Sequence, residues 1–214
     1  MSAVRRGPLC AILTLGLCML SLSVGHAQSK QNLLVVGVAN QLKDERWQDR
    51  RIGFGLTSLI AEALFDSDRF VLLEEKEEIR EQLRTVREKL WMLSEEAVQL
   101  AEAAKAAQQI GAEWMAYGRV VSFRTPSNRI SMGPFHSREK ITEIKVEVNL
   151  RDLQSGRTLS GDGKGKAKTT ATSVVFEYRQ DREEINFDKT TVGQATKEAV
   201  AQAVKKVLEE YGRE

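Results

Sequence analysis

The sequence is poor in the residues that build covalent crosslinks and metal sites. Its 214 residues include two cysteines, two histidines and three prolines. Both cysteines, Cys10 and Cys18, lie in the first 27 residues, so the rest of the chain forms no disulfide and has no thiolate nucleophile. His136 is the only histidine beyond that segment, and no motif supplies it with a nucleophile and an oriented carboxylate. We therefore expect a protein that is not an enzyme and binds no cofactor or metal.

The chain also lacks an excess of charge of either sign. It carries 32 Lys and Arg against 30 Asp and Glu, and two of the cations, Arg5 and Arg6, belong to the first 27 residues. A domain with balanced charge has no electrostatic attraction to a phosphate backbone. This balance argues against nucleic-acid binding, and no motif predicts a small-molecule substrate.

The N-terminus has the pattern of a secretory signal peptide. Two arginines precede an apolar run over residues 9–24, and small residues follow before a cleavage site between Ala27 and Gln28. An uncleaved anchor is the alternative, but the run is short for a spanning helix of about 20 residues. The pattern predicts a signal peptide over 1–27 and a single domain over 28–214. It also predicts export by the secretory pathway.

The hydrophobic pattern of the domain predicts a fold of the α/β (α+β) class, with a mixed β-sheet flanked by helices. Short apolar or alternating runs predict strands at 32–40, 69–75, 112–123 and 141–153. Amphipathic spacing predicts helices at 50–65, 74–93, 94–110 and 191–211. Asp49 is suited to cap the first of these helices, and Gly111 to end the third.

The stretch GDGKGKAK, residues 161–168, has some features of a phosphate-binding loop. A Walker A loop requires G-x-x-x-x-G-K-[ST] between a strand and a helix. Aligned on Gly165-Lys166, the chain has Ser160 in place of the first glycine and Ala167 in place of the hydroxyl. The stretch also lies on the returning strand of a hairpin, where glycine marks a bulge or a close backbone approach. We expect its role to be structural.

Four stretches carry a resemblance to a known family. They are LLVVGVAN, LTSLIAEALFDSDRFVLLEEKEEIREQL, IGAEWMAYGRVVSF and VEVNLRDLQSGRTLSGDGKGKA, in that order. This order resembles the CsgG-like proteins of bacterial envelopes, named for the outer-membrane curli secretion channel. The penicillin-binding-protein activator lipoproteins resemble the same domain. The resemblance covers nearly all of residues 28–214 and implies a CsgG-like domain.

The resemblance implies a function in assembly or export of an envelope or curli-type component, by protein binding, in the periplasm or at the outer membrane. Its partners would be envelope proteins and other copies of the chain, with indirect or weak membrane association. Two alternatives stay open on the same resemblance. One is a ring-forming outer-membrane secretion channel subunit, and the other is an activator of a cell-wall synthase.

The sequence departs from the channel members in two features. Those members carry a lipidated N-terminal cysteine, whereas Cys10 and Cys18 each follow a leucine. They also contribute two membrane-inserted β-hairpins from each subunit, and the first corresponding place here is residues 123–140. Pro126 and Pro134 are expected to interrupt strands in that segment.

The second place, within residues 168–191, is predicted to form a hairpin with an apolar face that is short for crossing a bilayer. We expect this face to contact the domain or a neighbouring subunit. Its members alternate along the two arms and are Val174, Phe176, Tyr178, Ile185 and Phe187.

The charged loop 41–51 is the other predicted contact surface. Trp47 lies there beside Arg50 and Arg51, and an aromatic flanked by arginines is typical of contact anchors. The alternative is that Trp47 folds back over the first helix.

Overall fold

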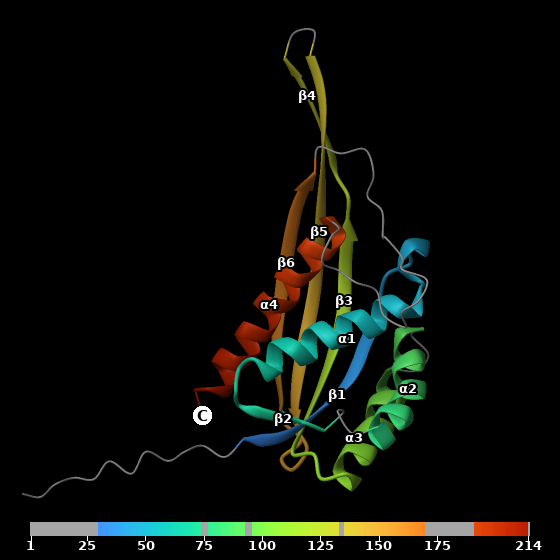
Figure 1. Cartoon of the computed structure of the whole chain (residues 1–214), viewed down its shortest axis with the longest axis vertical. Helices are drawn as coiled ribbons and strands as arrows, with labels where there is room; N and C mark the ends of the chain where they lie inside the picture. Colours follow the sequence, from blue (N-terminus) through green and yellow to red (C-terminus); the bar gives the residue numbers. More distant parts are fainter. Residues whose placement is uncertain (1–29, 74–76, 93–95, 133–134, 170–190, 214) are drawn as a thin grey trace, which may run out of the picture.

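The computed structural model describes residues 30–73, 77–92, 96–132, 135–169 and 191–213 (Figure 1). The predicted signal peptide with its cleavage site at Ala27 and Gln28 lies outside these residues. So does the predicted hairpin face around residues 174–187. Both therefore stay predictions.

In chain order the elements are β1 (Gln31–Asn40), the short 3-10 helix η1 (Glu45–Trp47), α1 (Arg50–Phe65), β2 (Phe70–Leu72), α2 (Glu77–Trp91), α3 (Glu96–Gln109), β3 (Trp114–Arg124), β4 (Ser127–Met132), β5 (Phe135–Asp152), β6 (Thr158–Thr169) and α4 (Thr191–Tyr211). The predicted fold class is confirmed. Asp49 caps α1 by accepting a 2.9 Å hydrogen bond from the Arg51 backbone N–H. Gly111 follows α3 with a φ of 81°, a conformation that glycine adopts without a steric penalty.

One mixed sheet organises the chain. Its strands lie in the order β2-β1-β3-β5-β4, and β6 pairs with β5 off this path. The pairings of β1 with β2 and β3 are parallel, and the pairings of β5 with β3, β4 and β6 are antiparallel. Residues 33–40 of β1 are all buried, because helices cover both faces of this strand. This explains the unbroken apolar run in its sequence.

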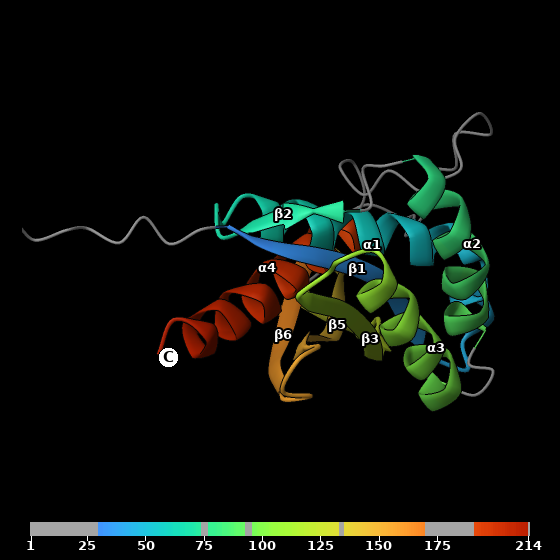
Figure 2. The ribbon, with the colours of Figure 1, turned by 90° about the horizontal axis from the view of Figure 1, so that it is seen from below.

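Helices α1 and α4 pack on one face of the sheet, and α2 and α3 on the other (Figures 1 and 2). The larger core lies under α1 and α4 and includes Leu56 and Val204. The smaller core lies under α2 and α3, where Leu34 and Val36 of β1 meet Leu83 of α2. The alternating side chains of β1 thus divide between the two cores.

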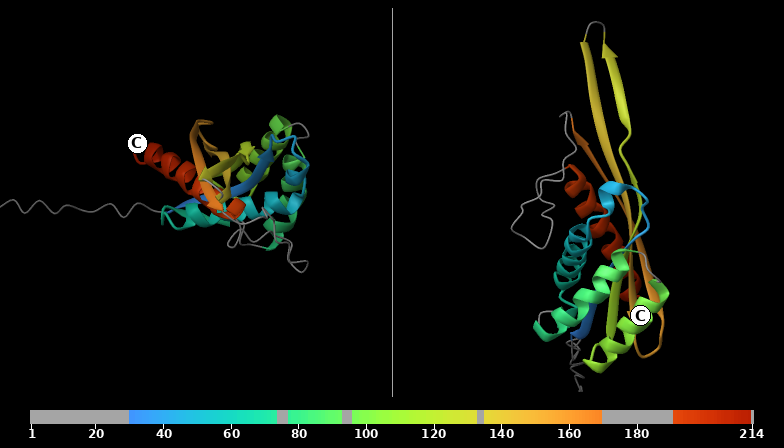
Figure 3. Two further views of the ribbon diagram at one scale, coloured as in Figure 1. Left: turned by 90° about the horizontal axis from the view of Figure 1, so that it is seen from above. Right: turned by 90° about the vertical axis from the view of Figure 1, so that its right-hand side faces the viewer.

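Strands β3 and β4 form one nearly continuous arm opposite β5. A bulge at Val121 shifts the register between Val120 and Ser122 of β3, and β4 then continues along β5 in the shifted register. The resulting long hairpin projects beyond the helices (Figure 3). As expected, Pro126 interrupts this arm, which breaks between Arg124 of β3 and Ser127 of β4, but β4 still forms beyond it. Pro134 lies outside the described residues. Pro126 lies between the two strands, where its carbonyl accepts a hydrogen bond from the Ile141 N–H at 3.0 Å.

The alternating glycines of β6 lie directly against the backbone of α4. A Cβ atom built on Gly161, Gly163 or Gly165 would overlap the carbonyl oxygen of Ala203, Ala199 or Ala195, respectively. Two residues of strand advance about 6.7 Å and four residues of helix about 6.0 Å, so the two periods nearly match. The motif GDGKGKAK is therefore a site of close helix–strand packing, as its sequence context predicted.

The free edge of β6 is covered by polar side chains of α4. The Lys166 N–H donates to Glu198 Oε2 at 2.9 Å, and the Lys164 N–H to Gln202 Oε1 at 3.3 Å. An edge strand with unpaired N–H groups is a template for pairing with another chain. Helix α4 thus closes this stretch of the edge while it packs on the face.

Candidate functional site: an arginine-lined groove between two helices

A groove of about 400 Å³ lies between the start of α1 and the middle of α2. Its lining contains five arginines, three carboxylates and one aromatic ring: Asp49, Arg50, Arg51, Phe54, Arg80, Glu81, Arg84, Arg87 and Glu88. The arginines come from two segments about thirty residues apart in the sequence. The groove therefore concentrates positive charge in a chain whose overall charge is balanced.

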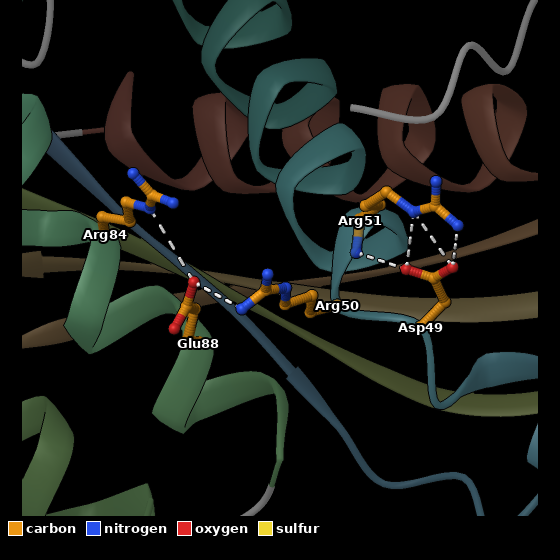
Figure 4. A network of polar contacts seen from close by, with 5 residues as sticks. All are labelled: Asp49, Arg50, Arg51, Arg84 and Glu88. Carbon is orange, nitrogen blue, oxygen red and sulfur yellow. Dashed lines mark hydrogen bonds and ion pairs between the residues drawn. The ribbon is translucent and has the colours of Figure 1, made fainter. Parts of the chain in front are cut away.

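The N-terminus of α1 supplies two of these arginines. Arg50 and Arg51 occupy the first turn, which contains no acidic residue. Cations are unfavourable at a helix N-terminus, because the backbone N–H groups there already carry partial positive charge. The Asp49 carboxylate offsets part of this, since Arg51 Nη2 lies 2.7 Å from Asp49 Oδ2 (Figure 4). The hydrogen bond from the Arg51 side chain is the main reason why the pKa of Asp49 lies below its ordinary 3.8.

One carboxylate lies between two arginines across the groove. Arg50 Nη1 lies 3.1 Å from Glu88 Oε1, and Arg84 Nε lies 3.8 Å from the same oxygen (Figure 4). The side chains of Arg50 and Arg84 are 60% and 51% exposed. A single carboxylate neutralises one of two guanidinium groups, so this part of the groove keeps a positive charge that faces solvent.

Arg87 fastens α2 to the bulge in β1. Its guanidinium donates to the carbonyl oxygens of Val35 and Val36, at 2.8 and 3.0 Å. The register of β1 with β3 shifts between Val35 and Gly37, which leaves Val36 as the bulged residue. The side chain of Arg87 thus satisfies backbone groups at the bulge and fixes the floor of the groove.

A second contact sets the spacing of the two helices. Gly53 of α1 faces the buried indole of Trp91, and a Cβ on Gly53 would lie 2.8 Å from ring atoms. Because position 53 has no side chain, α1 and α2 approach closely at this point. The groove opens beside this contact, with Phe54 of α1 and Glu88 of α2 among its lining residues.

The sequence as a whole matches the family model described as "Curli production assembly/transport component CsgG" over residues 20–213. The chain belongs to the CsgG family. Membership associates it with assembly or transport at the cell envelope rather than with catalysis.

Several solved structures resemble the chain at low identity. Lipoprotein GNA1162 from Neisseria meningitidis is 17% identical, with 67% of this chain and 87% of that chain covered and a TM-score of 0.44. The PelC dodecamer from Paraburkholderia phytofirmans is 13% identical, with 85% and 89% covered and a TM-score of 0.43. The hypothetical protein CT253 from Chlamydia trachomatis is 14% identical, with 86% and 95% covered and a TM-score of 0.42. No curated protein matches the chain in sequence.

Of the three residues predicted as contacts in the loop 41–51, two line the groove and the third is buried. Arg50 and Arg51 line the groove. Trp47 is fully buried, and its ring centroid lies 5.0 Å from that of Phe123 on β3. The prediction of Trp47 as an exposed anchor was wrong. The alternative, that it folds back over the first helix, is closer to the structure, because Trp47 belongs to the core that also contains Ile52 of α1. The Trp47 carbonyl accepts a 2.7 Å hydrogen bond from Asn40 Nδ2, which holds the loop against β1.

The arginines of α2 were not recognised from the sequence. Arg80, Arg84 and Arg87 belong to a helix with many charges, a pattern typical of a solvated face. Their spacing of three and four residues places them on one side of the helix, and that spacing was the available signal. What it did not reveal was that this side faces the N-terminus of α1.

A second cavity of about 420 Å³ lies on the sheet, where β3, β5 and β6 meet below the projecting hairpin. Lys164 and Lys166 of the glycine-rich stretch line it, and Lys166 Nζ pairs with Glu143 Oε1 at 2.8 Å. Among the described residues no cluster of three His, Cys, Asp or Glu could hold a metal ion. None of the helices in the described ranges has the length and hydrophobicity of a membrane span.

Proposed function

We propose that the protein acts without catalysis, by binding other proteins during the assembly or export of an envelope or curli-type component. The observation that carries this proposal is the match to the CsgG family over residues 20–213. In this proposal the chain is cleaved between Ala27 and Gln28 and works in the periplasm, associated with the outer membrane through its partners.

The domain supports this proposal with two kinds of contact surface. The first is the arginine-lined groove, which includes Arg50 and Arg51 of the predicted contact loop. The second is the projecting hairpin of β4 and β5, whose backbone extends beyond the helical layers (Figure 3). The apolar hairpin face that contains Phe176 and Phe187 stays a third proposed surface, for contact with the domain or another copy.

Cell fractionation and mass measurement test this function. The chain is expressed with its own N-terminal segment, and the mature N-terminus, the compartment and the mass without detergent are determined. We expect a periplasmic protein that begins at Gln28 and behaves as a monomer or small oligomer. Crosslinking in cells should then recover envelope proteins. A ring that requires detergent and fractionates with the outer membrane would support a secretion channel subunit instead.

The apolar hairpin face has its own test. Replacing Phe176 and Phe187 with serine should weaken oligomerisation, partner crosslinking or membrane association. If all three stay unchanged while the protein remains folded, this face has no role in the proposed function.

A further inference from the structure

The groove between α1 and α2 has the chemistry of a carboxylate-binding site. Among the described lining residues, five guanidinium groups face three carboxylates and there is no lysine. Guanidinium presents a planar fork of N–H donors that matches a carboxylate in two parallel hydrogen bonds, whereas ammonium acts as a point charge. The partial positive charge at the N-terminus of α1 adds to the same field.

The ion pairs now in the groove are open to exchange. Arg50, Arg84 and Glu88 are partly exposed, with exposed fractions of 60%, 51% and 27%. Exposed ion pairs contribute little to stability, because water solvates both partners well when they separate. An incoming carboxylate can therefore take over the N–H donors of Arg50 and Arg84 without a large loss elsewhere. Arg87, which is held by two backbone carbonyls, stays in place while this happens.

The remaining lining argues for an acidic polypeptide over other anions. Glu81 and Glu88 repel every anion, but a compact dianion such as phosphate more strongly than a carboxylate, which carries one negative charge. Carboxylates spaced along an extended chain can each pair with a different arginine. Phe54 is half-buried in the groove and offers an apolar surface. An acidic residue beside an apolar one satisfies the guanidinium groups and covers this ring at the same time.

We propose that the arginine-lined groove binds an extended acidic segment of a partner protein, with its carboxylates on Arg50 and Arg84 and an apolar side chain against Phe54. This inference rests on the proposed function and specifies the chemistry of the partner. The site requires no change in the fold, because Arg87 holds α2 on β1 and the contact between Gly53 and Trp91 holds α1 beside α2.

Fluorescence anisotropy with the purified protein tests this site. The probe is a fluorescein-labelled peptide that alternates glutamate with leucine and glycine, and its counterpart carries glutamine in place of glutamate. The test variant is R50Q/R84Q. The matched control is K105Q/K205Q, which removes the same charge from exposed positions on α3 and α4. Circular dichroism melting confirms that both variants are folded.

We expect the glutamate peptide to bind, the glutamine peptide to bind at least about tenfold more weakly, and added salt to weaken the first interaction. R50Q/R84Q should weaken binding of the glutamate peptide by about tenfold or more, and K105Q/K205Q should leave it unchanged. As a single substitution, Phe54→Ser should also weaken binding of the glutamate peptide, because it removes the apolar contact. Equal binding of both peptides, or equal loss in both double variants, would overturn the proposal.

Other anions are tested with the same variants. Inorganic phosphate, an oligouronate and phosphatidylglycerol vesicles are titrated against the protein. If one of these binds through Arg50 and Arg84 and the peptide does not, the groove serves that anion and the inference is wrong.

Crosslinking in cells separates this failure from that of the proposed function. If R50Q/R84Q keeps every envelope partner of the wild type, only the groove assignment fails. If the wild type has no envelope partner, the proposed function fails whatever the peptide does.

Discussion

Two close contacts of helices use glycine in different ways, one between a helix and a strand and the other between two helices. Between α4 and β6 the glycines at 161, 163 and 165 bring a helix backbone onto a strand backbone. Between α1 and α2 a single glycine, Gly53, admits the ring of Trp91, and charged side chains line the opening beside it. We call these contacts the α4–β6 seam and the α1–α2 seam. In the α4–β6 seam the strand packs directly on the helix, whereas the α1–α2 seam opens at one end into the arginine-lined groove.

The contact between α4 and β6 holds the domain together, whereas the contact between α1 and α2 leaves side chains available for binding. The α4–β6 seam also closes the edge of β6 through Glu198 and Gln202, so its polar side chains are used internally. The α1–α2 seam leaves Arg50 and Arg84 half exposed around one carboxylate. We therefore expect substitutions in the first seam to affect mainly stability, and substitutions in the second to affect binding as well.

The largest effect is expected for Gly163→Ala. The new Cβ would overlap the Ala199 carbonyl oxygen. The atoms nearest to it all belong to the backbone of α4, so a neighbouring side chain cannot change its rotamer to relieve the overlap. We expect a loss of about 3 kcal/mol or more in the free energy of unfolding, or failure to fold. Urea denaturation followed by circular dichroism measures it. Gly156→Ala is the control, since its φ is 75° and no described atom outside residues 155–157 lies within 4 Å of the new Cβ. A loss of about 1 kcal/mol is expected there. Equal losses in the two variants would remove the distinction between the seams.

A smaller effect is expected for Gly53→Ala, at the second seam. The new methyl group would lie 2.8 Å from the Trp91 ring, and the ring can move only by pushing α2 away from α1. We expect a loss of about 1–3 kcal/mol, together with weaker binding of the acidic peptide because the groove arginines move apart. Denaturation and anisotropy on the same preparation measure the two effects. Unchanged peptide binding in a destabilised variant would show that the groove does not depend on this spacing.

The edge covering of β6 is expected to contribute less to stability and more to solubility. In E198A/Q202A the N–H groups of Lys164 and Lys166 lose their acceptors but gain access to water, so a loss of about 1 kcal/mol is expected. The exposed edge should also promote self-association, which light scattering detects. Glu210→Ala, an exposed change at the far end of α4, is the control and should change neither quantity.

The smallest effect is on the acid side of the pH profile. The side-chain hydrogen bond from Arg51 lowers the pKa of Asp49 below 3.8, and the one from Lys206 lowers the pKa of Asp162 in the same way. A carboxyl with a lowered folded pKa contributes stability above its unfolded pKa and loses it as pH falls through the folded value. We expect stability to fall as pH decreases below about 4, and Asp49→Asn and Asp162→Asn each to flatten that fall slightly. An unchanged slope would show that these pairs are too well solvated to matter.

Much of the fold followed from local patterns. The helix over Arg50–Phe65 has the predicted bounds, because the Asp49 cap and the spacing of its apolar residues are both local signals. The alternating residues of the 141–153 strand were also recognised, although β5 begins earlier, at Phe135. Before Ile141 the alternating pattern is broken, and the antiparallel partner β4 is what completes the strand.

The sequence predicted the residues that α1 contributes to the candidate site but not those that α2 contributes. Arg50 and Arg51 were chosen as contact residues and line the groove, but Trp47, the anchor chosen with them, is buried. An aromatic residue in a charged loop carries no local sign of where its ring will lie. The position of Phe123 decided that, more than seventy residues further along the chain.

The sequence by itself determined the kinds of element, their order, the structural role of GDGKGKAK and the resemblance to the CsgG family, since caps, periods and motifs act within a few residues of one another. Only the tertiary structure decided that Gly161, Gly163 and Gly165 face the carbonyl groups of α4 and that the arginines of α1 and α2 share one groove. Both depend on the pairing of segments that lie thirty or more residues apart in the sequence. Such pairings are set by how two sheet faces bury their apolar side chains together, which no single segment encodes.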